Sequence, residues 1–307
     1  MNEEMIELAK ELYEEGKSYG DIVEAIYNKY NVMHHIDTIR YHVKRKHLPK
    51  VSLKDKLSSE GITKTLVLSD LHCPYHREDI LDIVEKHKDE IDTLVLGGDI
   101  IDCYAISSYP TLEPRPLVTE MASCHRMLKE IQDIIPDVKK IIVKGNHELR
   151  WEKYLGSMKS EVNKLHSANI LHEIVKGFEQ HDRQAGTITT YESLDYEVVD
   201  EWYCKVGDMI VCHPLSFSKV AAKTAEMALN YFVERGIDFN SVLIAHTHKI
   251  SSCFKYGKHA VEIGCMCKPQ EYANSGKLTY TQQCNGYYLA TFKDGKFDFN
   301  ESKQYVV

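Results

Sequence analysis

Short, mainly apolar runs that each end in polar residues are the feature that most constrains the fold of this chain. Five such runs recur along it, at Thr65–Leu68, Thr93–Leu96, Lys140–Val143, Met209–Val211 and Ser241–Ala245. Helical patterns lie between them, at residues 80–84, 127–134 and about 218–234. Short buried strands that alternate with helices predict an α/β sheet with crossover connections. From Cys253 to Val307 the alternating pattern instead predicts antiparallel strands.

Carboxylate, amide and imidazole side chains follow every one of these runs. In chain order, they are Asp70 and His72, Asp99, Asn146 with His147, His213, and His246 with His248. Ligand sites in open α/β sheets lie outside the carboxyl ends of the strands. We therefore expect these side chains to gather at one edge of the sheet.

The spacing and chemistry of these residues indicate a metal site. Asp70 and His72 are two residues apart, as are His246 and His248. On an extended chain such residues face the same side, so we expect each pair to deliver both side chains to one place. Carboxylate oxygen together with imidazole nitrogen suits Mn, Fe or Zn better than Ca or Cu(I).

The ordered set of motifs resembles that of the calcineurin-like metallophosphoesterases. The blocks D-x-H, G-D, G-N-H-E, a lone His and H-x-H follow one another between about residues 64 and 250. Two positions depart from the family's usual pattern, because Ala245 replaces the Gly of G-H-x-H and Cys212 precedes the lone His. Neither departure removes a ligand. The stretch Val261–Cys267, with Tyr272 after it, is similar to a segment of phage-type members.

The resemblance implies a metallophosphoesterase-type four-layer β-sandwich flanked by helices, with a site for two divalent transition-metal ions. Carried over residue by residue, the ligands are Asp70, His72 and His248 for one ion, Asn146, His213 and His246 for the other, and Asp99 as the bridge. Mn is the metal that we expect first, with Fe, Zn or Ni as alternatives. Two ions ~4 Å apart can activate a water between them and hold phosphate oxygens during in-line displacement. The family role of His147 is to donate a proton to the leaving oxygen or to stabilise its charge.

Several residues near these motifs carry two interpretations. Glu148 is expected to be a helix N-terminal residue, where the helix dipole favours a carboxylate. Arg150 either contacts the substrate phosphate or belongs to a surface ion pair. Asp102 either orients a ligand imidazole or caps the following helix. Cys73 and the Cys265-x-Cys267 pair are either soft metal ligands or small buried residues that pack in the core.

The first part of the chain predicts a separate unit. We divide the chain into a small all-α module at residues 1–50, a polar linker at 51–62 and the metallophosphoesterase domain at 63–307. Two amphipathic helical patterns, the second capped by Ser18, precede a third pattern that carries Arg40, Lys44 and Arg45 on one face. This order resembles a helix-turn-helix module that contacts DNA or RNA. The alternatives are a small bundle with a solvated basic face, or a module for oligomerisation.

Composition narrows the class of protein. The net charge of −8 argues against a broad, nonspecific nucleic-acid surface. The nine Cys are scattered without a C-x-x-C pair, which fits reduced intracellular thiols. The acidic, amphipathic N-terminus is not a secretory signal, and no apolar run approaches the ~20 residues that span a bilayer. We therefore expect a cytoplasmic protein with no membrane partner.

Hydrolysis of phosphodiester bonds in nucleic acid or nucleotides, nuclease activity included, is the function that we expect first. One alternative is a phosphomonoesterase that acts on proteins or small molecules. The other is a DNA-binding regulator with a vestigial metal site. Residues 103–118 contain Tyr and Pro and predict an ordered loop over the site, which favours small or single-stranded substrates.

Overall fold

A computed structural model of the chain describes residues 3–36, 38–39, 57–58, 60–108, 115–157, 161–269 and 283–307. The chain divides into two compact units, Met1–Val51 and Ser52–Val307. Each unit has a hydrophobic core of its own.

The first unit is built on two helices, α1 (Glu3–Glu14) and α2 (Tyr19–Tyr30). As predicted, Ser18 caps α2: its side chain accepts a hydrogen bond from Asp21 N, and the Asp21 carboxylate accepts one from Ser18 N. This reciprocal pair satisfies donors that a helix start leaves open. The buried residues of the unit are Met5, Ala9, Ile22, Ile26 and Ile39. Arg40, Lys44 and Arg45 lie outside the described residues, so their contact with nucleic acid stays a prediction.

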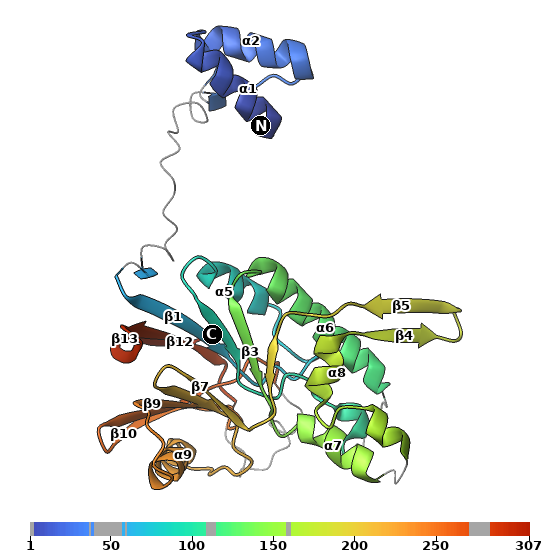
Figure 1. Cartoon of the computed structure of the whole chain (residues 1–307), viewed down its shortest axis with the longest axis vertical. Helices are drawn as coiled ribbons and strands as arrows, with labels where there is room; N and C mark the ends of the chain where they lie inside the picture. The colour runs from blue at the N-terminus through green and yellow to red at the C-terminus, as the bar shows by residue number, and fades with distance from the viewer. Residues whose placement is uncertain are drawn as a thin grey trace. The chain divides into compact units, whose positions relative to one another are not determined.

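The larger unit contains a six-stranded sheet with the strand order β13-β12-β1-β2-β3-β6 (Figure 1). Its strands are β1 (Ile62–Leu68), β2 (Thr93–Leu96), β3 (Lys139–Val143), β6 (Glu197–Val199), β12 (Gly286–Lys293) and β13 (Lys296–Val306). Strands β1, β2, β3 and β6 run parallel, whereas β12 is antiparallel to both β1 and β13. Leu68 at the end of β1 lies opposite Leu96 at the end of β2. The residues that follow these strands therefore start from the same edge.

A second sheet of five strands has the order β10-β11-β9-β8-β7. Its strands are β7 (Tyr203–Val206), β8 (Met209–Cys212), β9 (Ser241–Ile244), β10 (Ile250–Lys255) and β11 (Lys258–Ile263). Strand β9 pairs in parallel with both β8 and β11. A separate hairpin of β4 (Phe178–Asp182) and β5 (Thr187–Tyr191) projects from the domain in Figure 1.

Helices cover the outer faces of the two sheets, as Figure 1 shows. They are α5 (Ile80–His87), α6 (Leu117–Ile134) and α8 (Ile170–Lys176) on the six-stranded sheet and α9 (Lys223–Glu234) on the five-stranded sheet. Helix α7 (Glu148–Ser157) lies against α8, and η1 (Tyr104–Ile106) and η2 (Glu161–Leu165) are short 3-10 turns. Alternate residues of a strand face opposite sides of a sheet. Leu66 and Leu68 of β1 accordingly pack against α5, α6 and α8, while Val67 packs against the second sheet. The other face of the second sheet packs against α9.

The larger unit thus has three hydrophobic cores, which lie between four successive layers. These layers are the helices α5, α6 and α8, the six-stranded sheet, the five-stranded sheet and the helix α9. The predicted four-layer β-sandwich flanked by helices is therefore confirmed. Two details differ from the prediction. Helix α9 begins at Lys223 and not near Ser218, and β11 in the C-terminal third pairs in parallel with β9. In the part of the chain that the structure describes, no helix is both long and apolar enough to cross a membrane.

Candidate metal centre

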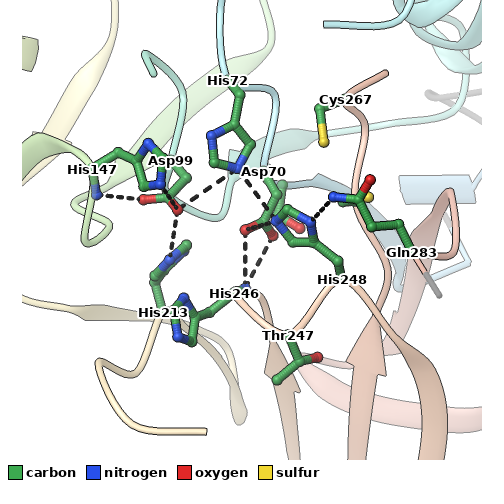
Figure 2. A network of polar contacts seen from close by, with 12 residues as sticks. Asp70, His72, Asp99, His147, His213, His246, Thr247, His248, Cys267 and Gln283 are labelled. Atoms are coloured by element: carbon green, nitrogen blue, oxygen red, sulfur yellow. Dashed lines mark hydrogen bonds and ion pairs between the residues drawn. The ribbon is translucent and has the colours of Figure 1, made fainter. Parts of the chain in front are cut away.

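The polar side chains that follow the parallel strands meet in one place. Asp70 and Asp99 follow β1 and β2, Asn146 follows β3, His213 follows β8, and His246 follows β9. Figure 2 shows the side chains converging from both sheets, with labels on Asp70, His72, Asp99, His147, His213, His246 and His248. Asn146 joins them through its Oδ1, which lies 3.0 Å from His213 Nε2. The structure thus brings all seven predicted ligands together.

Two groups of possible metal ligands share Asp99. Asp70, His72 and Asp99 offer ligand atoms that lie within 4.8 Å of one another, and Asp99, His213 and His246 do the same. His248 adjoins the first group, because its Nε2 lies 3.1 Å from Asp70 Oδ1. A carboxylate has two oxygens, so Asp99 is able to serve both groups at once.

The backbone at these positions differs from the extended chain on which the sequence argument relied. Asp70 and His72 have φ of 53° and 50°, and His246 and His248 have φ of 75° and 52°. These angles belong to the left-handed region, which residues other than Gly adopt uncommonly, although Asn, Asp and His are enriched there. The prediction of an extended chain at these positions is therefore wrong. The side chains reach the site because tight turns aim them there, and such local strain is typical of functional sites.

Hydrogen bonds fix the orientation of two of the imidazoles. His72 Nδ1 lies 3.0 Å from Asp102 Oδ1, and His213 Nδ1 lies 2.8 Å from the Gly97 carbonyl oxygen. Each acceptor holds the ring proton on Nδ1, which leaves the lone pair of Nε2 free to bind a metal ion. The Nε2 atoms of His72 and His213 lie 3.8 and 3.4 Å from Asp99 Oδ2. Asp102 therefore orients a candidate ligand, which is the first of its two predicted roles.

One buried nitrogen supports the presence of a metal ion. Within the described part of the chain, His246 Nε2 is buried without a hydrogen-bond partner. An unpaired buried polar atom costs free energy, and a metal ion in the group of Asp99, His213 and His246 would remove that cost. The donors around it are carboxylates and imidazoles, which suit a divalent transition metal. The residues therefore fit the metal that the motifs imply.

Buried charges set the ionisation of the centre. Burial acts to raise the pKa of Asp70, but the imidazoles of His248 and His213 outweigh it and lower that pKa to about 2. Burial and the neighbouring His213 lower the pKa of His246 to about 4. Burial also acts to lower the pKa of His213, but Asp99 outweighs it and raises that pKa to about 9. Because only a neutral imidazole binds metal, binding at His213 must release a proton and weaken as the pH falls.

His147 lies beside this centre. Its Nδ1 is 2.7 Å from the Asp102 carbonyl oxygen, and its Nε2 is 3.8 Å from Asp99 Oδ2. Arg150 donates from Nη1 to the Asp102 carbonyl oxygen at 2.8 Å, and its Nη2 lies 3.0 Å from His147 Nε2. Arg150 thus belongs to the site and not to a surface ion pair. Its contact with a substrate phosphate stays a proposal.

Glu148 has a larger role than its position at the start of α7 predicted. The carboxylate is buried and accepts four backbone N–H groups, from Asp99, Ile100, Ile101 and Gly145. It therefore joins the turn after β2 to the turn after β3. The turns approach so closely that a Cβ added at Gly145 would lie 2.3 Å from Asp99 N. The motif G-N-H-E marks this residue in the sequence, but only the fold shows what its carboxylate binds.

Replacing Glu148 with Gln tests this role. An amide has one acceptor oxygen, so some of the four N–H groups lose their partner, and we expect the free energy of unfolding to fall by about 2–5 kcal/mol. We expect metal affinity to fall about 10- to 100-fold, because the turn that carries Asp99 loosens. Denaturant unfolding and a metal titration measure the two effects. Glu152→Gln, on the exposed side of the same helix, is the matched control, and wild-type behaviour of Glu148→Gln would refute the role.

Two further residues near the site, Cys267 and Gln283, had only a weak sequence motif or none to predict their position. Cys267 is buried, and its sulfur forms a possible ligand group with His72 and His248 (Figure 2). Gln283 Nε2 lies 2.7 Å from His248 Nδ1, and nothing in the sequence around Gln283 pointed to the site. Cys73 and Cys265 are also buried, and neither belongs to a candidate metal group among the described residues.

Comparisons with known proteins agree with this geometry. The profile described as calcineurin-like phosphoesterase matches residues 63–250, which is more than half of the chain. The chain therefore belongs to the calcineurin-like phosphoesterase family. No curated protein matches the chain significantly in sequence.

Solved structures resemble the chain only distantly. Vacuolar protein sorting 29 from Cryptosporidium parvum is 12% identical over 80% of this chain and 98% of its own, with a TM-score of 0.37. Zn-bound Vps29 from Entamoeba histolytica is 13% identical over 80% and 98%, with a TM-score of 0.38. A structure described as a novel archaeal phosphodiesterase is 13% identical over 80% and 100%, with a TM-score of 0.36.

Proposed function

We propose that the chain is a phosphodiesterase that uses two divalent transition-metal ions and acts on nucleotides or nucleic acid. The observation that carries the proposal is the position of Asp99, which is shared by two ligand groups at the edge where both sheets end. A single-ion site would need no such shared carboxylate. The ordered, buried imidazoles around it argue against a vestigial site, because a centre without function has no need of oriented ligands.

The chain's own residues then have distinct tasks. Asp70, His72 and His248 would hold one ion, Asn146, His213 and His246 the other, and Asp99 would bridge them. When bound, the ions would activate a water molecule for attack on phosphorus and would offset the charge of the phosphate. His147 would protonate the leaving oxygen or stabilise its charge, with Asp102 holding its ring. We expect Mn first, and Fe, Zn or Ni as alternatives, since the same donors suit all four.

A pair of chromogenic substrates tests the proposal. With Mn²⁺ present, we expect faster hydrolysis of bis-(4-nitrophenyl) phosphate than of 4-nitrophenyl phosphate. The same assay on single- and double-stranded DNA and RNA then tests for nuclease activity. Preference for the monoester would instead support the phosphomonoesterase alternative. If neither substrate is hydrolysed with any of Mn, Fe, Zn or Ni, the result would support the third alternative, a DNA-binding regulator with a vestigial metal site.

We also propose that the helical module at residues 1–50 contacts DNA or RNA through Arg40, Lys44 and Arg45. Reversing these three charges to Glu should weaken polynucleotide binding and reduce its salt dependence by a slope of about 0.9 for each phosphate that the module no longer neutralises. Hydrolysis of the small diester should not change, because all proposed ligands lie in the second unit. A matched control reverses Lys10, Lys17 and Lys29 of the same module. A change of mass in light scattering with unchanged affinity would favour an oligomerisation module instead.

A further inference from the structure

A cavity of about 480 Å³ lies directly beside the proposed metal centre. Its wall includes Gly145, which precedes the candidate ligand Asn146, and Pro214, which follows the candidate ligand His213. Consecutive Cα atoms are ~3.8 Å apart, so this wall begins one residue from the centre. The volume is in the range of pockets that enclose a small organic group, about 300–1,000 Å³.

The wall of the cavity is mostly apolar and partly aromatic. Its side chains include Leu149, Trp202, Leu215, Met227, Ala228 and Tyr231. The ring of Trp202 stacks on Phe232, with centroids 5.3 Å apart, and meets Tyr231 edge-on at 5.1 Å. These contacts hold the aromatic part of the wall in place without a ligand.

The polar residues of the cavity are Lys144, Asp200, Glu201, Ser216 and Thr224, which are two acidic residues against one basic residue. The Asp200 carboxylate already accepts a hydrogen bond from Asn169 Nδ2 and lies 3.1 Å from His172 Nε2, so Glu201 is the acidic residue that offers a carboxylate to a ligand. Carboxylates accept hydrogen bonds and repel anions. Because the two acidic residues outnumber the single Lys144, the cavity favours a neutral group with N–H donors over a second phosphate.

Exposed apolar side chains continue from the cavity towards the metal centre. Leu215 and Met227, which line the cavity, are 61% and 44% exposed. Phe217 is 53% exposed, and its ring lies 5.2 Å from that of His246. Apolar surface gathered in this way marks binding sites. The loop that carries Leu215 and Phe217 is also anchored, because Lys249 Nζ donates a hydrogen bond to the Ser218 carbonyl oxygen at 2.6 Å.

We propose that this cavity binds the base of a nucleotide ester while the phosphate of that ester lies at the metal centre. The proposal rests on the phosphodiesterase function and narrows its substrate class to esters with a planar, nitrogen-bearing aromatic ring. Aromatic walls suit stacking on a base, and the Glu201 carboxylate suits its N–H groups. An alkyl chain would fill the apolar space but would make no stacking contact with the aromatic rings.

A matched pair of diesters tests the proposal. The 4-nitrophenyl ester of adenosine 5′-phosphate and methyl 4-nitrophenyl phosphate have the same leaving group and the same charge. We expect the adenosine ester to have a kcat/KM about 10- to 100-fold higher, as stacking of one base would supply. Leu215→Ala combined with Met227→Ala should reduce this ratio towards one. Val220→Ala is the control, since Val220 is 67% exposed on the same loop but lies outside the lining of the cavity, and it should keep the ratio.

A binding measurement separates the cavity from the reaction. Adenosine, which has no phosphate, should bind the full chain in a calorimetric titration, and the double variant should bind it at least about tenfold more weakly than Val220→Ala. Adenosine binding with this dependence but without ester hydrolysis would support the cavity and overturn the phosphodiesterase. Hydrolysis of both esters with equal kcat/KM, and no adenosine binding, would overturn the cavity proposal alone. A higher kcat/KM for an octyl ester than for the methyl ester, with no increase for the adenosine ester, would overturn the proposal. The cavity would then bind an alkyl chain instead of a base.

Discussion

Asp99→Asn is expected to remove the proposed bridge between two ions and to lower turnover by about 10³-fold or more, because metal-based charge stabilisation is worth several kcal/mol. The substitution keeps the shape of the side chain. Asp99 Oδ1 accepts the backbone N–H of His147 at 2.8 Å, and an Asn oxygen is able to do the same. Oδ2 faces the Nε2 atoms of His72 and His213, at 3.8 and 3.4 Å. An amide nitrogen in that place binds no metal.

The expected result therefore combines a native fold with a damaged centre. Elemental analysis should find fewer than two ions for each chain, and circular dichroism should match the wild type. Asp133→Asn is the matched control, because Asp133 lies on the exposed side of α6 and pairs with Lys129. A variant with both ions and undiminished turnover would show that Asp99 is not the bridge.

His147→Ala is expected to keep both ions and to slow turnover by about 10²-fold or more, the usual effect of losing a general acid. His147 lies against the centre but belongs to neither of the groups that share Asp99. The defect should shrink for esters with good leaving groups, such as 4-nitrophenol, because these leave without a proton. A series of aryl diesters with leaving groups of increasing pKa measures this dependence.

The control for His147 is His181→Ala, on the exposed β4–β5 hairpin. Loss of metal from His147→Ala would make His147 a ligand. A defect of the same size for every leaving group would show that His147 does not act on the leaving oxygen.

The layers of the fold were predictable from the sequence, because apolar residues recur at the spacing of the buried faces of its strands and helices. Leu66 and Leu68 face the helices while Val67 faces the second sheet, so both faces of the strand are buried at these positions and its sequence there is an unbroken apolar run. The candidate ligands were also predictable. Asp70, Asp99, Asn146, His213 and His246 follow apolar strands, and parallel strands end at a common edge.

What the sequence did not show depends on contacts between distant residues. The carboxylate of Glu148 binds N–H groups about 47 to 49 positions away, in the turn after β2. The left-handed turns at Asp70 and His246 were not predicted, because Asp and His are only modestly enriched in that backbone region and adopt others far more often. The apolar cavity joins Trp202, Leu215 and Tyr231 from separate elements, which individually resemble ordinary core or surface residues.

The metal content of the purified full chain tests the central claim most directly. Elemental analysis should find two transition-metal ions for each chain, among Mn, Fe, Zn and Ni. A chelator should remove both the ions and the diesterase activity, and adding Mn²⁺ should restore them. Absence of these metals, together with diesterase activity that a chelator does not affect, would contradict the two-ion centre built around Asp99.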